Sequence, residues 1–166
     1  NMKKLIIIFF IIPNIVFASP MKMIGEKGKL SEVNKTIEIK MYDNYFEPKE
    51  IKIKKNETVR FLITNYGELV HEFNIATREM HLNHQDEMMK MMEYGILLGD
   101  KIDKQKMKEL SKKDHSLAHT HKNSLLLEPN QSGELIWRFS KDIVLEAACN
   151  VPGHYDSGMI TKITNL

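Results

Sequence analysis

Polar and apolar residues alternate in two separate parts of the chain, and this alternation restricts the chain to folds built from short β-strands. Within residues 36–75 the alternation runs through TIEIKM, EIKIKKNETVRFLITN and LVHEFNI, which are rich in β-branched and aromatic residues. From Ser124 onward it returns in SLLLEP, ELIWRF, IVLEAAC and GMITKIT, with turn-forming residues between the segments. Several short strands separated by turns predict an all-β sandwich or barrel.

The middle of the chain, about residues 77–123, carries no such alternation. It is rich in helix-forming residues and contains most of the Met and His residues. It therefore predicts a largely helical, Met/His-rich insertion between two strands of the sandwich, in which Gly95 and Gly99 separate one helix from another.

The first residues have the features of an export signal. Two lysines precede the apolar run LIIIFFIIPNIVFA, and small residues occupy the cleavage positions at Val16 and Ala18. The alternative is an uncleaved membrane anchor, but the run is short for a membrane span and is broken by Pro13. We therefore expect a signal peptide over residues 1–18, a mature domain over residues 19–166 in the periplasm, and no membrane insertion after cleavage.

The net charge of the chain is +2 at pH 7, and loss of the two N-terminal lysines brings it to about zero. This balance gives no support for nucleic acid or an anionic membrane as a partner.

Cys149 is the only cysteine, so it cannot form an internal disulfide in an oxidising compartment. It is either buried and inert, paired with another chain, or a metal ligand or nucleophile.

The segment CNVPGHYDSGM gathers three metal-ligating side chains at equal intervals, namely Cys149, His154 and Met159. A Cys thiolate and two imidazoles in a trigonal set, with a weak axial thioether, form a type 1 (blue) copper site. Pro152 and Gly153 allow the sharp bend that this loop needs. Zinc is the main competitor for a Cys-His-His set, but an axial Met is not a zinc preference.

The second imidazole must come from elsewhere in the chain, and His71 is the best candidate. It lies inside the apolar segment LVHEFNI, where an unpaired imidazole would be costly to bury. Taken singly, the three loop residues are better explained without a metal, as a small buried Cys, a loop His and a Met that fills the core. Their spacing, in a β-rich chain with an export signal, favours copper instead.

The segments VHEFNI, ELIWRF and ACNVPGHYDSGM, followed by a last strand, resemble those of the cupredoxins, the superfamily of plastocyanin and azurin. The resemblance covers residues 37–75 and 124–163. It implies a Greek-key β-sandwich that holds copper, as Cu(I) or Cu(II), near one end. It also implies the copper ligands His71, Cys149, His154 and Met159.

Two features depart from most cupredoxins. Glu72 stands where many of them carry Asn or a similar small polar residue. This leaves open which hydrogen bond ties the strand to residues 149–159, which we call the cysteine loop. The insertion is also longer than the segments that connect these strands in simple cupredoxins.

The residues beside Cys149 are Ala148 and Asn150. The histidine that links a blue copper to a catalytic copper in multicopper oxidases and nitrite reductases is therefore missing. We expect no catalysis beyond one-electron transfer.

The insertion carries a second set of soft ligands in TREMHLNHQDEMMKMMEY. On a helix, the following side chains fall within about 120° of arc: Met80, His81, His84, Met88, Met91 and Met92. One interpretation is a thioether and imidazole surface that binds auxiliary Cu(I), because soft ligands select that ion. The other is the core-facing side of an amphipathic helix, with Met as flexible filler, although the single aliphatic residue, Leu82, lies on a different face.

The segment HSLAHTH places His115 and His119 one helical turn apart, with His121 nearby. Such a pair can chelate a divalent metal ion, but exposed histidines on a helix are also common. Both interpretations stay open for these three residues.

Two function classes fit these features. In the first, the Met/His insertion collects Cu(I) and the type 1 site holds or oxidises it, as in the exported cupredoxins associated with copper tolerance that the chain resembles. In the second, the chain is a plain soluble electron carrier that passes electrons to a redox protein partner near His154. The insertion then serves only for packing or docking.

Overall fold

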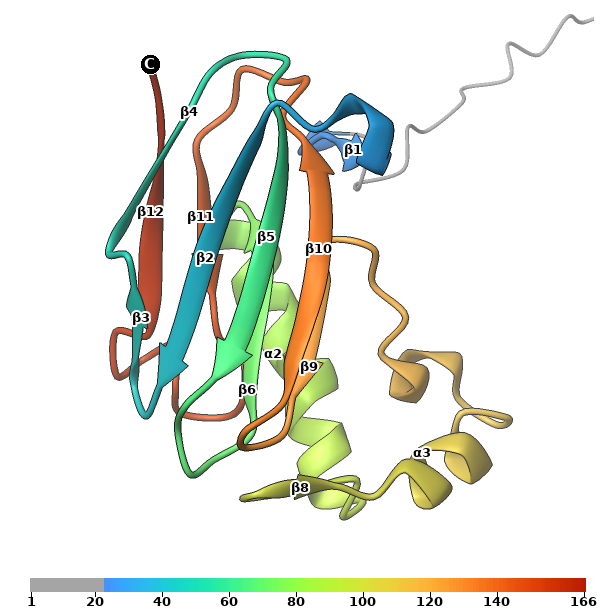
Figure 1. Cartoon of the computed structure of the whole chain (residues 1–166). Coiled ribbons are helices and arrows are strands. Elements are labelled where there is room, and N and C mark those ends of the chain that lie inside the picture. Colours follow the sequence, from blue (N-terminus) through green and yellow to red (C-terminus); the bar gives the residue numbers. More distant parts are fainter. Residues whose placement is uncertain (1–22) are drawn as a thin grey trace, which may run out of the picture.

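The computed structural model describes residues 23–166, so the signal peptide expected over residues 1–18 lies outside the described part. Two five-stranded sheets pack face to face in a β-sandwich, as the alternation predicted (Figure 1). From edge to edge, the first sheet contains β1 (Glu26–Lys27), β10 (Ser132–Arg138), β5 (Thr58–Asn65), β2 (Lys35–Tyr42) and β3 (Tyr45–Glu47). The second contains β4 (Glu50–Ile53), β12 (Ile160–Asn165), β11 (Leu145–Ala148), β6 (His71–Ala76) and β9 (Ser124–Leu127). Neighbouring strands pair antiparallel, except that β2 with β5 and β4 with β12 are parallel.

Alternating side chains of both sheets fill the space between them. In β5, Val59, Phe61 and Ile63 are fully buried, while the residues between them are partly exposed. The ring of Phe61 packs against those of Phe73, in the facing sheet, and Phe139, at centroid distances of 5.3 and 6.3 Å. Burial of this apolar surface is the main force that holds the two sheets together.

Strand β6 departs from the alternation because all of its residues are buried. It pairs with β11 on one edge and with β9 on the other, and one of its faces lies against the core. Its other face is covered by the insertion, which packs on the same sheet (Figure 1). The polar side chains of β6 are thus removed from water, and each needs a partner inside the protein.

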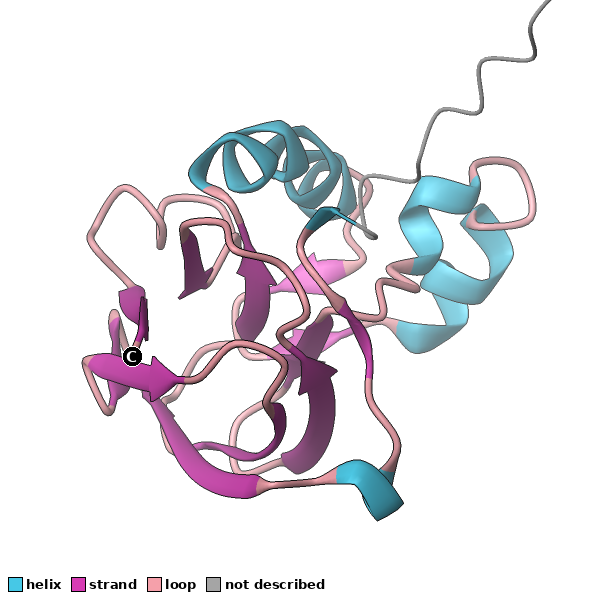
Figure 2. Cartoon of the chain, turned by 90° about the horizontal axis from the view of Figure 1, so that it is seen from above, coloured by secondary structure: helices cyan, strands magenta, loops and turns pink. Residues whose placement is uncertain are grey.

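The insertion consists mainly of helices, as predicted. Its elements are α2 (Arg78–Glu93), the short strands β7 (Leu97–Leu98) and β8 (Lys101–Ile102), α3 (Lys104–Leu110) and the 3-10 helix η2 (His115–Ala118). Figure 2 shows the helices of the insertion on the outside of the sandwich. A shorter 3-10 helix, η1 (Leu30–Glu32), precedes β2. Within residues 23–166, no helix combines the length and the apolar character needed to cross a membrane.

Helix α2 begins and ends at residues that suit these positions. The Thr77 side chain accepts a hydrogen bond from the Met80 N–H and so caps the first turn. Gly95 follows the last turn with a positive φ of 66°, a conformation that glycine adopts without strain. Helix α3 begins only after Gly99, so both glycines separate the two helices, as the sequence predicted.

Phe61→Ala should lower the free energy of unfolding by about 3–5 kcal/mol, because it removes a buried ring from the contact between the sheets. Urea unfolding of the metal-free protein, followed by circular dichroism, measures this change. Val144→Ala is the control, since Val144 is 86% exposed and the expected change is within about 0.5 kcal/mol. Similar losses in both variants would contradict the assignment of Phe61 to the core.

Candidate metal centre

The loop that carries three of the predicted ligands is held between two neighbouring strands. Cys149 follows β11 and Met159 precedes β12, and these strands pair antiparallel. The Cys149 N–H donates to the Met159 carbonyl, and the Met159 N–H donates to the His154 carbonyl, both at 3.1 Å. Gly153 and Gly158 adopt positive φ angles of 84° and 89°, which close the turn. These hydrogen bonds and turns fix the positions from which the ligand side chains project.

The predicted ligands His71, Cys149 and His154 come together where β6 begins and β11 ends. Their ligand atoms all lie within 4.8 Å of one another. Cys149 Sγ lies 3.8 Å from His71 Nδ1 and 3.4 Å from His154 Nδ1. Bonds of about 2.3 Å to sulfur and about 2.0 Å to nitrogen, about 120° apart, place two such atoms roughly 3.7 Å from each other. The spacing therefore fits a trigonal metal site, and Met159 is fully buried in the same core cluster as Cys149.

The Cys149 thiol is buried, and its sulfur accepts a hydrogen bond from the Glu72 backbone N–H at 3.3 Å. Burial raises the pKa of this thiol to about 12. A metal ion that binds the sulfur as thiolate has to displace the proton, so metal binding is coupled to proton release.

His71 presents Nδ1 to the site because its other ring nitrogen is held by a carboxylate. His71 Nε2 lies 2.8 Å from Asp43 Oδ1, and Asp43 also accepts hydrogen bonds from the Glu68 N–H. Burial lowers the pKa of His71, and the pairing with Asp43 only partly offsets this, so the ring is neutral and able to ligate a metal. Gly67 makes the pairing possible, since a Cβ there would overlap the Asp43 carboxylate and lie 2.8 Å from His71 Nε2.

Glu72 ties β6 to the cysteine loop, which answers the question that the sequence left open. Its Oε2 accepts hydrogen bonds from the backbone N–H of Asn150 at 3.2 Å and from its side-chain Nδ2 at 2.8 Å. The tie is made by a buried carboxylate that adjoins His71 in sequence, and its partner adjoins Cys149.

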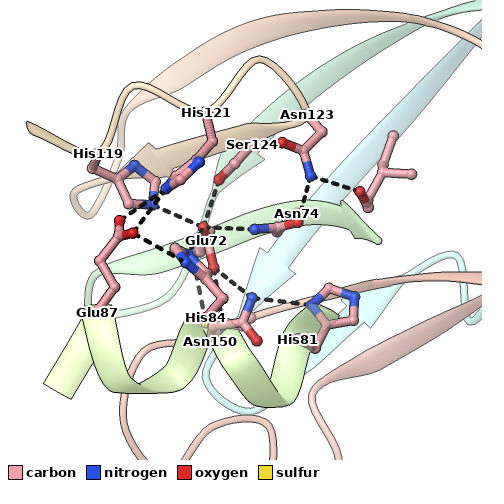
Figure 3. Close-up of polar contacts among 12 residues, drawn as sticks. Glu72, Asn74, His81, His84, Glu87, His119, His121, Asn123, Ser124 and Asn150 are labelled. Atoms are coloured by element: carbon pink, nitrogen blue, oxygen red, sulfur yellow. Dashed lines mark hydrogen bonds and ion pairs between the residues drawn. The ribbon is translucent and has the colours of Figure 1, made fainter. Parts of the chain in front are cut away.

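The other oxygen of Glu72 faces the insertion (Figure 3). Glu72 Oε1 lies 2.9 Å from His119 Nε2 and 3.1 Å from His84 Nε2. Ser124 Oγ and Asn74 Nδ2 also donate to this oxygen, at 2.5 and 3.1 Å. Although burial raises the pKa of Glu72, the hydrogen bonds from His119 and His84 hold it well below its usual range. The carboxylate is therefore charged although it is fully buried.

His121 and Glu87 extend this network along α2. His121 Nε2 lies 2.8 Å from Glu87 Oε1, and His84 Nδ1 lies 3.7 Å from Glu87 Oε2. Although burial lowers the pKa of His84, its hydrogen bond and charge interaction with Glu72 raise that pKa above its ordinary value. His84 thus links the two carboxylates (Figure 3).

The methionines of α2 do not share one exposed surface. Met88 and Met91 are fully buried in the core, and Met80 is partly buried against it. Met92 is 40% exposed and is not part of the core. Packing therefore accounts for Met88 and Met91, which was one of the two interpretations of this helix.

The histidines of the insertion divide in a similar way. His81 is buried, with Nδ1 at 3.1 Å from Asn150 Nδ2, and His115 is exposed at the start of η2. The structure brings His84, His119 and His121 together. The sequence did not place Glu72 and Glu87 among these histidines. The signal was present, because a glutamate inside the apolar segment LVHEFNI needs charged or hydrogen-bonding partners when it is buried.

Comparisons with known proteins show which family the chain resembles. The family model described as Cupredoxin-like domain matches residues 7–93. The copper-resistant cuproprotein CopI of Pseudomonas aeruginosa is 37% identical over 154 residues, which covers 84% of this chain and 81% of that protein. CopI of Rubrivivax gelatinosus is 28% identical over 140 residues, with 84% and 71% covered. The structure of auracyanin B superposes with a TM-score of 0.59 at 16% identity, covering 86% of this chain and 96% of auracyanin B.

Asp43→Asn should weaken copper binding about 10–100-fold, because the partner of a ligating histidine sets its orientation and basicity. The substitution keeps the size of the side chain and removes its charge. Competition with a chelator of known affinity gives the dissociation constant. Asp142→Asn, which changes an exposed residue at the opposite end of β11 from Cys149, serves as the control. Equal affinities in the two variants would contradict the role given to Asp43.

Proposed function

Because the chain belongs to the cupredoxin superfamily and, within it, to the CopI family of copper-resistant cuproproteins, we propose that it is an exported type 1 copper protein that supports copper tolerance. The observation that carries the proposal is the convergence of His71 Nδ1, Cys149 Sγ and His154 Nδ1. These residues would hold copper in a trigonal set, with Met159 as the weak axial ligand.

Copper bound by this set supplies a one-electron couple, since sulfur ligands suit Cu(I) and imidazoles suit Cu(II). The protein supplies a fixed cage for the ion. Asp43 holds the His71 ring, the Glu72 N–H donates to Cys149 Sγ, and hydrogen bonds within the loop hold the remaining ligands. Ligand side chains that are held by such hydrogen bonds keep their positions in both redox states.

The role in copper tolerance rests on the relationship to CopI proteins, which are described as copper-resistant cuproproteins. A periplasmic location rests on the signal-like residues 1–18. Ala148 and Asn150 flank Cys149, so no adjacent histidine leads from the type 1 site to a catalytic copper, and we propose no turnover beyond one-electron transfer.

A plain electron carrier is the second candidate, and the burial of Met88 and Met91 favours it. These two thioethers belong to the core, so part of the Met-rich segment serves for packing. In that case a redox protein partner would dock near His154, which is partly exposed beside the exposed Gly153.

Copper titration of the mature protein should produce an intense visible absorption band from charge transfer between the Cys149 thiolate and Cu(II). Cys149→Ser should abolish this band, since a hydroxyl does not replace a soft thiolate ligand. Met89→Leu, which changes a Met that is 45% exposed on α2, should leave the band unchanged. A chain that binds copper without the band would sink the type 1 assignment.

A growth test separates copper tolerance from plain electron transfer. Expression of the chain in a Pseudomonas aeruginosa strain that lacks its own CopI should restore growth at toxic copper concentrations. The Cys149→Ser chain, expressed to the same level, should not, because it lacks the thiolate ligand. If the intact chain showed the absorption band but gave no protection, the plain electron carrier would be the better description.

A further inference from the structure

Besides the type 1 ligands, residues 23–166 contain two further groups of side chains that are spaced to hold a metal ion. Glu72, His84 and His119 form one group, and His84, Glu87 and His121 form the other. Within each group the ligand atoms lie within 4.8 Å of one another. The groups share His84, and Figure 3 shows all five side chains converging between β6, α2 and the segment before β9.

We propose that Glu72, His84 and His119, with Glu87 and His121 beside them, form a second metal site that binds Cu(II). This site goes beyond the proposed type 1 copper function and uses none of its ligands.

The donor atoms indicate the kind of ion. Imidazole nitrogens and carboxylate oxygens suit divalent transition metals, and among these Cu(II) binds such a site most tightly. The three imidazole rings lie close together, with centroids 5.5 Å apart for His84 and His119, 4.8 Å for His84 and His121, and 5.2 Å for His119 and His121. No thiolate takes part, so the site differs in chemistry from the type 1 site.

The surroundings of Glu72 also favour a cation. Its carboxylate is fully buried, yet among the described residues its ion pairs are with His84 and His119 and with no Lys or Arg. A buried carboxylate needs a compensating positive charge. Four hydrogen-bond donors lie around the single oxygen Oε1. The two oxygens of a carboxylate together offer about four lone-pair positions, so Oε1 has more donors than it can accept from at once. A metal ion between Glu72 and the two imidazoles would supply the charge and replace two of these donors.

Two of the imidazoles of this group border a cavity. A cavity of about 340 Å³ lies beside the network and is lined by residues that include Met80, His84 and His121. His121 is also the most exposed of the three imidazoles, with 37% of its side chain accessible against 10% for His84 and 6% for His119. His121 is therefore the imidazole of this group that is most accessible to solvent, and Glu72 is its fully buried member.

The site would be joined to the type 1 site through one side chain. Glu72 Oε1 faces His84 and His119, while Oε2 accepts two hydrogen bonds from Asn150, the residue after Cys149. An ion on Oε1 withdraws electron density from Oε2 and weakens its hold on the cysteine loop. Metal binding by the insertion would thus change the hydrogen bonds that hold the cysteine loop, although the insertion contributes no type 1 ligand.

The test is a titration of the mature protein with Cu(II), followed by electron paramagnetic resonance and by metal analysis after dialysis. We expect a second equivalent of copper with a type 2 signal and nitrogen hyperfine splitting, distinct from the type 1 signal. His84→Asn and His119→Asn should each weaken this second equivalent at least about tenfold, because even the outer partner of a metal ligand is worth that much. His115→Asn is the matched control, since His115 is an exposed histidine four positions before His119 and belongs to neither group.

The outcomes separate this site from the type 1 site. Loss of the type 2 signal in His84→Asn and His119→Asn, with the type 1 band intact, supports the second site and also shows that the variants are folded. A type 2 signal that depends on these histidines in a chain without the blue band would sink the type 1 assignment and keep the second site. A second equivalent that is absent, or that survives both substitutions, would overturn the proposal. Loss of that equivalent in His115→Asn alone would also overturn it.

Discussion

The burial of one charge, that of Glu72, organises the functional end of this protein. A carboxylate that is removed from water needs several hydrogen bonds, and Glu72 receives them from α2, from the segment before β9 and from the cysteine loop. Its backbone N–H contacts the Cys149 sulfur, one carboxylate oxygen binds the cysteine loop, and the other binds histidines of the insertion. Glu72 therefore joins the insertion, the sandwich and the cysteine loop through hydrogen bonds.

This arrangement explains why β6 carries polar residues without exposing them. In a sandwich strand that faces solvent on one side, Glu72 and Asn74 would point into water. Here the insertion covers that side, so both side chains take part in a buried network. The insertion turns this face of the sheet into a buried polar layer.

The sequence predicted the parts of the fold that depend on local patterns. Alternation located the strands, and the glycines near positions 95 and 99 marked the gap between helices. The candidate ligands in the cysteine loop stand out in the sequence because one short segment carries them, and the structure brings the buried strand histidine His71 close to Cys149 and His154. The network around Glu72 was not predictable in this way, since His119 and Ser124 lie 47 and 52 positions away from it and meet it only when the insertion folds back.

The α2 helix shows a different limit of sequence reasoning. Periodicity finds the face on which Met80, Met88 and Met91 lie, but it does not tell whether that face meets the core or the solvent. Methionine fits either setting, because its side chain is apolar and also a soft ligand. The structure buries Met88 and Met91, and only the packing of α2 on the sheet could decide this.

His71 and Cys149 lie 78 positions apart, so an unfolded chain does not hold the four predicted ligands together. Copper that binds only the folded form stabilises it, by about 2.7 kcal/mol when the free ion is at a hundred times its dissociation constant. The lifetime of the protein in a compartment that contains proteases therefore rises with the copper supply. Copper would regulate the abundance of its own binding protein through thermodynamics alone, without any change in gene expression.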